Sequence, residues 1–148
     1  MAELSYPLGS GARGAVHSAT GKAVADITLD AVASGAVGPS DVAISAETLR
    51  LQAGFAESGG NPQLADNLRR AAELVAFKDD DLLSFYEMLR PGRSSAEELD
   101  ALADALAERG AERCATLVRE ACAAYVRRGL IAETDQLRFR SSQDGEST

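Results

Sequence analysis

The chain has 148 residues, enough for one modest core, and carries 23 acidic against 15 basic side chains for a net charge of −8. This balance argues against a nucleic-acid-binding protein, because phosphate backbones select clustered Lys and Arg. Hydrophobic residues make up 45% of the sequence, but alanine supplies many of them and buries little area, so we expect a lean core that completes its burial on a partner.

Residues 1–39 form the first segment and differ in composition from the rest of the chain. Six glycines and two prolines fall in this stretch, and we expect an irregular arm lying on a partner. One or two helical turns are predicted at about residues 30–34, ended by Gly35. Four apolar side chains are spaced as anchors for a partner surface: Tyr6, Leu8, Ile27 and Leu29. A disordered arm is the alternative.

Start and stop signals predict two helices after this arm. Ser45 is the N-cap of a helix over residues 46–58 that ends at Gly59-Gly60. Asn61 caps the next helix, and Pro62 occupies its first position. The apolar face predicted for this second helix comprises Leu64, Leu68, Ala71, Ala72 and Val75.

A third, short helix is predicted to start at Asp79 or Asp80 and to stop at Pro91-Gly92. Its expected buried face comprises Leu82, Leu83, Tyr86 and Leu89. Because no segment shows sustained period-two alternation, we expect no strand beside it.

Two longer helices complete the pattern. Ser95 and Glu98 form a capping box for the fourth, whose apolar face is Leu99, Leu102, Ala103 and Leu106. The fifth runs over residues 111–128 and ends at Gly129. Its predicted apolar face comprises Cys114, Leu117, Val118, Ala121, Cys122 and Tyr125. The fold class is therefore all-α, with an arm over 1–39, a helical domain over 40–131 and a flexible tail over 132–148.

The cysteines and the lack of export signals indicate a cytoplasmic protein. Cys114 and Cys122 lie about 12 Å apart along one helix, which prevents a disulfide between them. We expect two buried free thiols. No secretory signal and no apolar run of membrane-spanning length is present.

Two glycine patterns resemble phosphate-binding motifs but lack their context. The stretch Gly9–Gly14 fits G-x-G-x-x-G, yet only eight residues precede it and one is Pro7, so no strand can lead into it. Gly21-Lys22 would need a glycine where Val16 stands and Ser or Thr where Ala23 stands. Neither pattern predicts a nucleotide site.

The charged side chains also favour structural interpretations. Asp79–Asp81 suits a helix start and lacks the spacing of a calcium loop. His17, the sole histidine, has no partner for a catalytic relay. The pairs Arg69-Arg70 and Arg90/Arg93 are interpreted as ion-pair partners for the abundant acids. We predict no catalytic, cofactor-binding or metal-binding residue in this chain.

Several phrases of the sequence resemble the small subunit of adenosylcobalamin-dependent diol and glycerol dehydratases. They are ISAETLRLQA (44–53), NLRRAAEL (67–74), YEMLRPGRS (86–94), TGKAVADITLDAVASGAVGPSDV (20–42) and CATLVREACAAYVRRGL (114–130). The resemblance extends from Tyr6 to about Ile131. It lies in the order and combination of these phrases, none of which is a chemical signature.

This resemblance implies a lyase built as a heterohexamer of two large, two medium and two small subunits. The large and medium subunits would enclose adenosylcobalamin, whose radical chemistry converts a 1,2-diol or glycerol to an aldehyde and water. The small subunit would be mainly helical, without catalytic residues, and would stabilise the complex by packing on the large subunit. Whether glycerol or propane-1,2-diol is preferred is not decided by this chain.

One departure from the family and one alternative function remain. Some diol dehydratase small subunits carry a longer extension before the Tyr-Pro-Leu phrase, associated with packing into a microcompartment, whereas five residues precede Tyr6 here. We therefore do not expect such targeting through this chain. The alternative function is a stand-alone acidic helical adaptor that binds another protein, with the same lean core and exposed arm.

Overall fold

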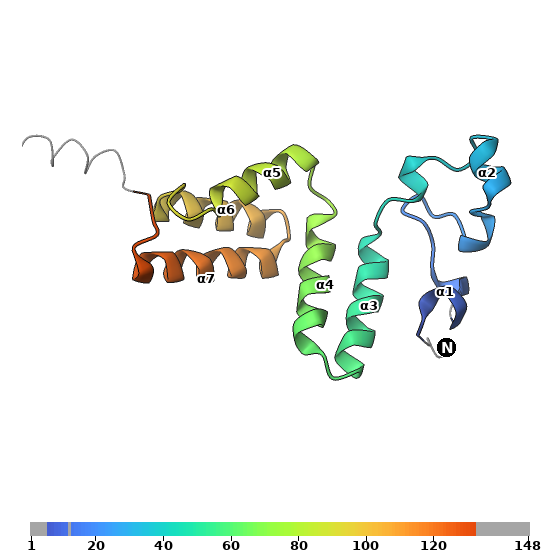
Figure 1. Cartoon of the computed structure of the whole chain (residues 1–148), viewed down its shortest axis with the longest axis horizontal. Coiled ribbons are helices and arrows are strands. Elements are labelled where there is room, and N and C mark those ends of the chain that lie inside the picture. Colours follow the sequence, from blue (N-terminus) through green and yellow to red (C-terminus); the bar gives the residue numbers. More distant parts are fainter. Residues whose placement is uncertain (1–5, 12, 133–148) are drawn as a thin grey trace, which may run out of the picture. The chain divides into compact units, whose positions relative to one another are not determined.

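The computed structural model describes residues 6–11 and 13–132. Within these ranges the chain is helical, and strand-like pairing is limited to one β-bridge between His17 and Ala23 (Figure 1). The predicted all-α class is therefore confirmed. The predicted tail, residues 132–148, falls outside the described ranges apart from Ala132.

The chain divides into two compact units, which we describe separately. The first runs to Val75 and the second begins at Ala76. The predicted arm, residues 1–39, therefore belongs to the same unit as the first two long helices. A domain boundary at residue 40 stays a prediction.

The arm consists of short helical turns joined by irregular chain. Its helical pieces are α1 (Leu8–Gly11), η1 (Arg13–Ala15), η2 (Val24–Asp26), α2 (Leu29–Ala33) and η3 (Pro39–Asp41). Helix α2 confirms the turn expected before Gly35, and the Oγ1 of Thr28 caps it by accepting from the Ala31 amide at 3.2 Å. Leu8, predicted as an anchor for a partner, is instead buried within the chain.

Helices α3 (Ala46–Ser58) and α4 (Pro62–Leu74) form a hairpin in the first unit (Figure 1). The predicted caps are confirmed: Ser45 Oγ accepts from the Thr48 amide at 3.4 Å, and Asn61 Oδ1 accepts from the Leu64 amide at 3.1 Å. Two short side chains satisfy the helix starts without any long-range contact.

The predicted apolar face of α4 is partly wrong. The fully covered positions are Ala65 and Ala72, whereas Leu64 is 45% exposed and Val75 is 42% exposed. Ala53 of α3 is also fully covered. Because alanine lets two helices approach closely, their contact line is narrow and the leucine beside it stays open.

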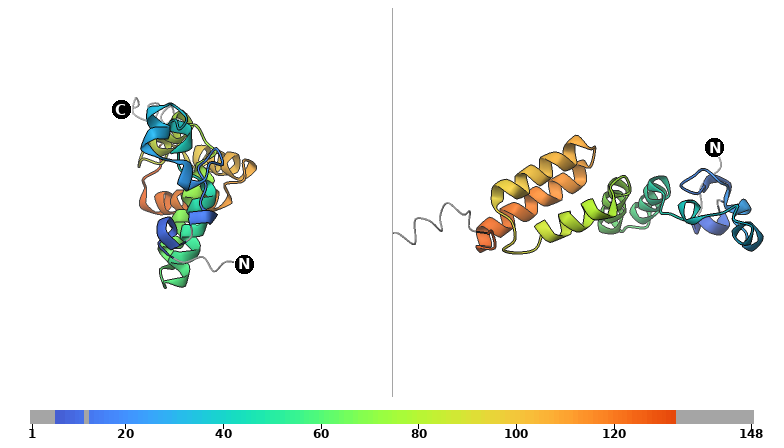
Figure 2. Two further views of the ribbon diagram at one scale, coloured as in Figure 1. Left: turned by 90° about the vertical axis from the view of Figure 1, so that its right-hand side faces the viewer. Right: turned by 90° about the horizontal axis from the view of Figure 1, so that it is seen from above.

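The second unit contains α5 (Asp79–Met88), α6 (Ala96–Glu108) and α7 (Glu112–Arg128). Helices α6 and α7 lie side by side in both views of this pair (Figures 1 and 2). The predicted face of α6 is confirmed at all four positions, with Leu99 only 1% exposed. The capping box is also confirmed: the Glu98 amide donates to Ser95 Oγ at 3.2 Å, and the Ser95 amide donates to Glu98 Oε2 at 2.8 Å.

Helix α7 confirms most of its predicted face. Cys114, Val118 and Cys122 are buried, but Leu117 is 45% exposed, and Ala115, which was not predicted, is buried. Gly129 ends the helix with φ +65°, a left-handed conformation that glycine adopts without steric penalty.

The predicted buried face of α5 is wrong at two positions. Leu83 is 67% exposed and Tyr86 is 65% exposed. The inward ring is Phe85, which meets the buried Phe77 edge-on with ring centroids 5.5 Å apart. An apolar contact between α5 and the rest of its unit is therefore made by Phe85 with Phe77, which precedes the helix, whereas Leu83 and Tyr86 stay largely exposed.

Candidate interaction surface

The charged side chains that were candidates for phosphate or metal binding form ion pairs or lie at helix starts. Lys22 forms an ion pair with Asp41 at 2.8 Å, so it belongs to a salt bridge within the arm. Asp81 pairs with Arg109 at 3.3 Å, and Asp79–Asp81 lie in the first turn of α5. No group of three or more potential metal ligands is found among the described residues.

Arg69, Arg90 and Arg93 pair with acids, as predicted. Arg69 pairs with Glu57 and, at 3.5 Å, with Asp66, while Arg70 donates to the side-chain oxygen of Asn67. In the second unit Arg90 and Arg93 share Glu87, at 2.9 and 3.1 Å. Hydrogen bonding from Arg90 lowers the pKa of Glu87 from its ordinary value.

The two cysteines are free and buried, as predicted. Burial raises the pKa of Cys122, and the nearby acids Asp100 and Glu97 act in the same direction. A thiol kept protonated at neutral pH is a poor nucleophile and a poor metal ligand. Cys122 therefore contributes to the α6–α7 core, where its Sγ lies 3.8 Å from the Ala96 carbonyl oxygen.

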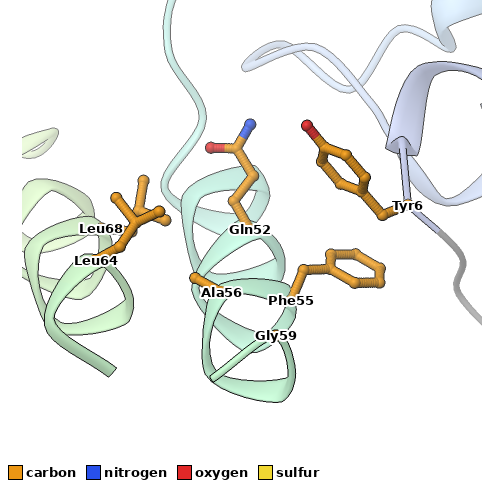
Figure 3. Close-up of a pocket in the computed structure, with 7 residues that line it drawn as sticks. All are labelled: Tyr6, Gln52, Phe55, Ala56, Gly59, Leu64 and Leu68. Carbon is orange, nitrogen blue, oxygen red and sulfur yellow. The ribbon is translucent and has the colours of Figure 1, made fainter. Parts of the chain in front are cut away.

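An apolar pocket of about 570 Å³ lies in the first unit (Figure 3). Tyr6 and Phe55 flank one side of α3, with ring centroids 6.1 Å apart, and Leu64 and Leu68 of α4 lie on the other. Its remaining lining residues are Gln52, Ala56 and Gly59. The walls offer contact to apolar side chains and few groups that could direct a reaction.

A second hollow of about 330 Å³ adjoins the first through Gln52. His17 and Ile44 line it with residues of α3. His17 is exposed and its backbone pairs with Ala23. The hydroxyl groups that line this hollow belong to Ser45 and Thr48, and Ser45 Oγ already caps α3 by accepting from the Thr48 amide. Its described lining includes no carboxylate that could orient the imidazole.

Large apolar side chains are open to solvent in both units. Those of the arm and its junction with α3 are Tyr6 (76% exposed), Leu29 (88%), Val32 (53%), Val42 (65%) and Ile44 (68%). On α5 they are Leu83 and Tyr86. Among the described residues, many buried apolar positions are alanine or cysteine. The expectation of a lean core with uncovered apolar surface is met, and such surface is typical of a protein that packs on another.

The sequence missed both the Asp41 salt bridge and the openness of α5. In the sequence, Lys22 belongs only to an incomplete phosphate-binding pattern, and nothing local links it to Asp41. Leu83 and Tyr86 have helical spacing, which indicates an apolar face without saying which chain covers it. The openness of α5 could have been suspected from its apolar stripe, because no neighbouring predicted helix was assigned to cover it.

A family model described as dehydratase small subunit matches residues 1–132. The chain is 48% identical over 131 residues to the propanediol dehydratase small subunits of Citrobacter freundii and Salmonella typhimurium strain LT2. These alignments cover 88% of this chain and 76% of each relative. The chain belongs to the dehydratase small-subunit family.

A dehydratase small subunit implies other dehydratase subunits as partners. Family membership therefore explains the open apolar surface better than a stand-alone adaptor does. No helix within the described ranges is long and apolar enough to cross a membrane.

Proposed function

We propose that this chain is the small subunit of a diol or glycerol dehydratase, an adenosylcobalamin-dependent lyase that converts a 1,2-diol or glycerol to an aldehyde and water. The observation that carries this proposal is the 48% identity over 131 residues to two propanediol dehydratase small subunits. Identity at this level along most of both chains supports the same role in a related complex. The enzyme would work in the cytoplasm.

In this proposal the chain contributes no catalytic, metal-binding or cofactor-binding residue. Adenosylcobalamin does not fit the described residues: the sole histidine is exposed, and the larger pocket is walled mainly by apolar side chains, with Tyr6 and Gln52 as its polar ones. Large and medium subunits would hold the cofactor and the substrate between them. Two copies of each of the three chains would make the complex.

The small subunit would stabilise the complex by packing on the large subunit. The open side chains of the arm and α5 support this role, because their burial in an interface recovers the hydrophobic free energy that the chain forgoes alone. Leu29 in the arm is 88% exposed, and Leu83 on α5 is 67% exposed. Tyr86 adds a large aromatic of the kind enriched at interfaces.

The test is reconstitution with and without this chain. Large and medium subunits would be produced alone or with the small subunit, and adenosylcobalamin-dependent aldehyde formation measured with propane-1,2-diol and with glycerol. We expect activity to be most durable with all three chains, and none from the small subunit alone. Turnover of diol or binding of cobalamin by the isolated chain would contradict the proposal.

A further inference from the structure

The Asp41 carboxylate is the hub of a hydrogen-bond cluster in the arm. Its Oδ2 accepts from Lys22 Nζ and from the Gly38 amide, both at 2.8 Å, and its Oδ1 accepts from the Thr20 hydroxyl. Asp41 is only 6% exposed. A carboxylate this well covered and bonded joins segments of the chain that are otherwise irregular.

Lys22 connects the cluster to Ala36 as well. The same ammonium donates to the Ala36 carbonyl oxygen at 2.7 Å. Around it, the Ser18 amide donates to the Lys22 carbonyl oxygen at 2.8 Å and the Val37 amide donates to the Ala31 carbonyl oxygen at 3.0 Å. Residues 20–41 thus form a loop that is closed at its base and includes η2, α2 and η3.

The cluster holds its charge at neutral pH. Hydrogen bonds from Lys22 and Thr20 lower the pKa of Asp41 to about 2. Hydrogen bonds to a charged acceptor are stronger than those between neutral groups. They offset the entropy that a flexible segment loses when its ends are brought together.

The closed loop carries open apolar side chains. Leu29 and Val32 lie on α2 within the loop, and Val42 and Ile44 lie within three residues after its closing residue, Asp41. A segment ordered before binding loses less entropy when it docks than one that must fold on its partner.

We propose that Asp41 locks residues 20–41 into a closed loop in the free subunit, so that these apolar side chains are already in place when the dehydratase large subunit binds. The docking part of this inference rests on the proposed function. The lock itself is a property of the isolated chain. Asp41 acts here as a positioning residue.

Amide hydrogen exchange on the isolated full-length chain tests the lock. The variant is Asp41→Asn, which keeps the side-chain shape but removes the charge and one acceptor. Asp26→Asn is the matched control, because it makes the same chemical change at an exposed site of the same loop. The amides of Ser18 and Val37 are the reporters, since they bond to backbone carbonyls and not to Asp41.

We expect Ser18 and Val37 to exchange at least about tenfold faster in Asp41→Asn and at an unchanged rate in Asp26→Asn. Amides of α3 and α4, which belong to the same unit as the loop, should keep their protection, which shows that this unit remains folded. Equal exchange in wild type and Asp41→Asn, or an unprotected loop already in the wild type, would overturn the lock.

Association kinetics with the co-purified large and medium subunits test the docking part. We expect Asp41→Asn to bind about tenfold more weakly, with the loss mainly in the association rate constant, and Asp26→Asn to bind like wild type. Unchanged kinetics in Asp41→Asn would overturn the docking part. A wild-type chain that does not bind would contradict the proposed function, while the exchange result would still decide the lock.

Discussion

Asp41 is held in its charged form by three donors, two of which lie 21 and 19 residues away in the sequence. Thr20, Lys22 and Gly38 supply three donors to one carboxylate. Removing its charge by acid should have the same consequence as removing it by substitution. We therefore expect the closure of the loop in the arm to depend on pH.

Lowering the pH should open the arm between about 4 and 2. The pKa of Asp41 is lowered from 3.8 to about 2, so its contribution to folding is fully present above the unfolded value and is lost as the pH falls through the folded value. Exchange of the Val37 amide in the isolated chain, measured from pH 7 to pH 2, checks this. Loss of protection already near pH 6 would point to another group.

Substituting the sole histidine should leave catalysis by the assembled complex nearly unchanged. We expect His17→Ala to lower kcat/KM for propane-1,2-diol by no more than a few-fold, because His17 is exposed and its backbone forms a bridge with Ala23 that alanine can also form. A loss above about a hundredfold, the scale of general acid–base catalysis, would contradict a chain without catalytic residues.

At the scale of helices, the caps could be predicted closely from sequence and the covered faces less well. Ser45, Asn61 and Ser95 bond within three residues, so local sequence suffices to place them. The face of α6 was also predicted because α7 covers it within the same chain. Leu83 and Leu117 were misassigned because helical spacing does not reveal whether a stripe faces its own chain or a partner.

The α6–α7 core should be sensitive to loss of volume. Leu99 is 1% exposed, so Leu99→Ala should lower the free energy of unfolding of its unit by about 2–5 kcal/mol. Denaturant unfolding of the isolated chain, followed by far-ultraviolet circular dichroism, measures this. A change below about 0.5 kcal/mol would mean that Leu99 is not enclosed in solution.

The open face of α5 should matter for assembly and little for folding. We expect the double variant Leu83→Ser/Tyr86→Ser to keep the helical content and unfolding midpoint of the isolated chain, because both side chains are largely exposed. Its affinity for the large and medium subunits should fall at least about tenfold, since apolar burial is lost from the interface.

The matched control for this variant is Ser84→Ala, an exposed polar position on the same helix. It should bind the other subunits as wild type does. If the double variant binds equally well, the large subunit does not cover α5 and the interface must lie on the other open residues.

At the scale of the whole chain, two small helical units leave large apolar side chains open while alanine fills much of their interior. The sequence predicted this balance from its alanine content. It could not predict the closed loop of the arm, because Lys22 and Asp41 are 19 residues apart and only short helical turns lie between them. Only the fold brings these groups together.

The most direct test is the native mass of the complex that co-purifies with this chain after co-expression with dehydratase large and medium subunits. With an affinity tag on this chain, we predict a complex that contains equal copies of all three subunits and forms aldehyde only with adenosylcobalamin. Recovery of this chain alone, folded and helical, would contradict its role as a dehydratase subunit.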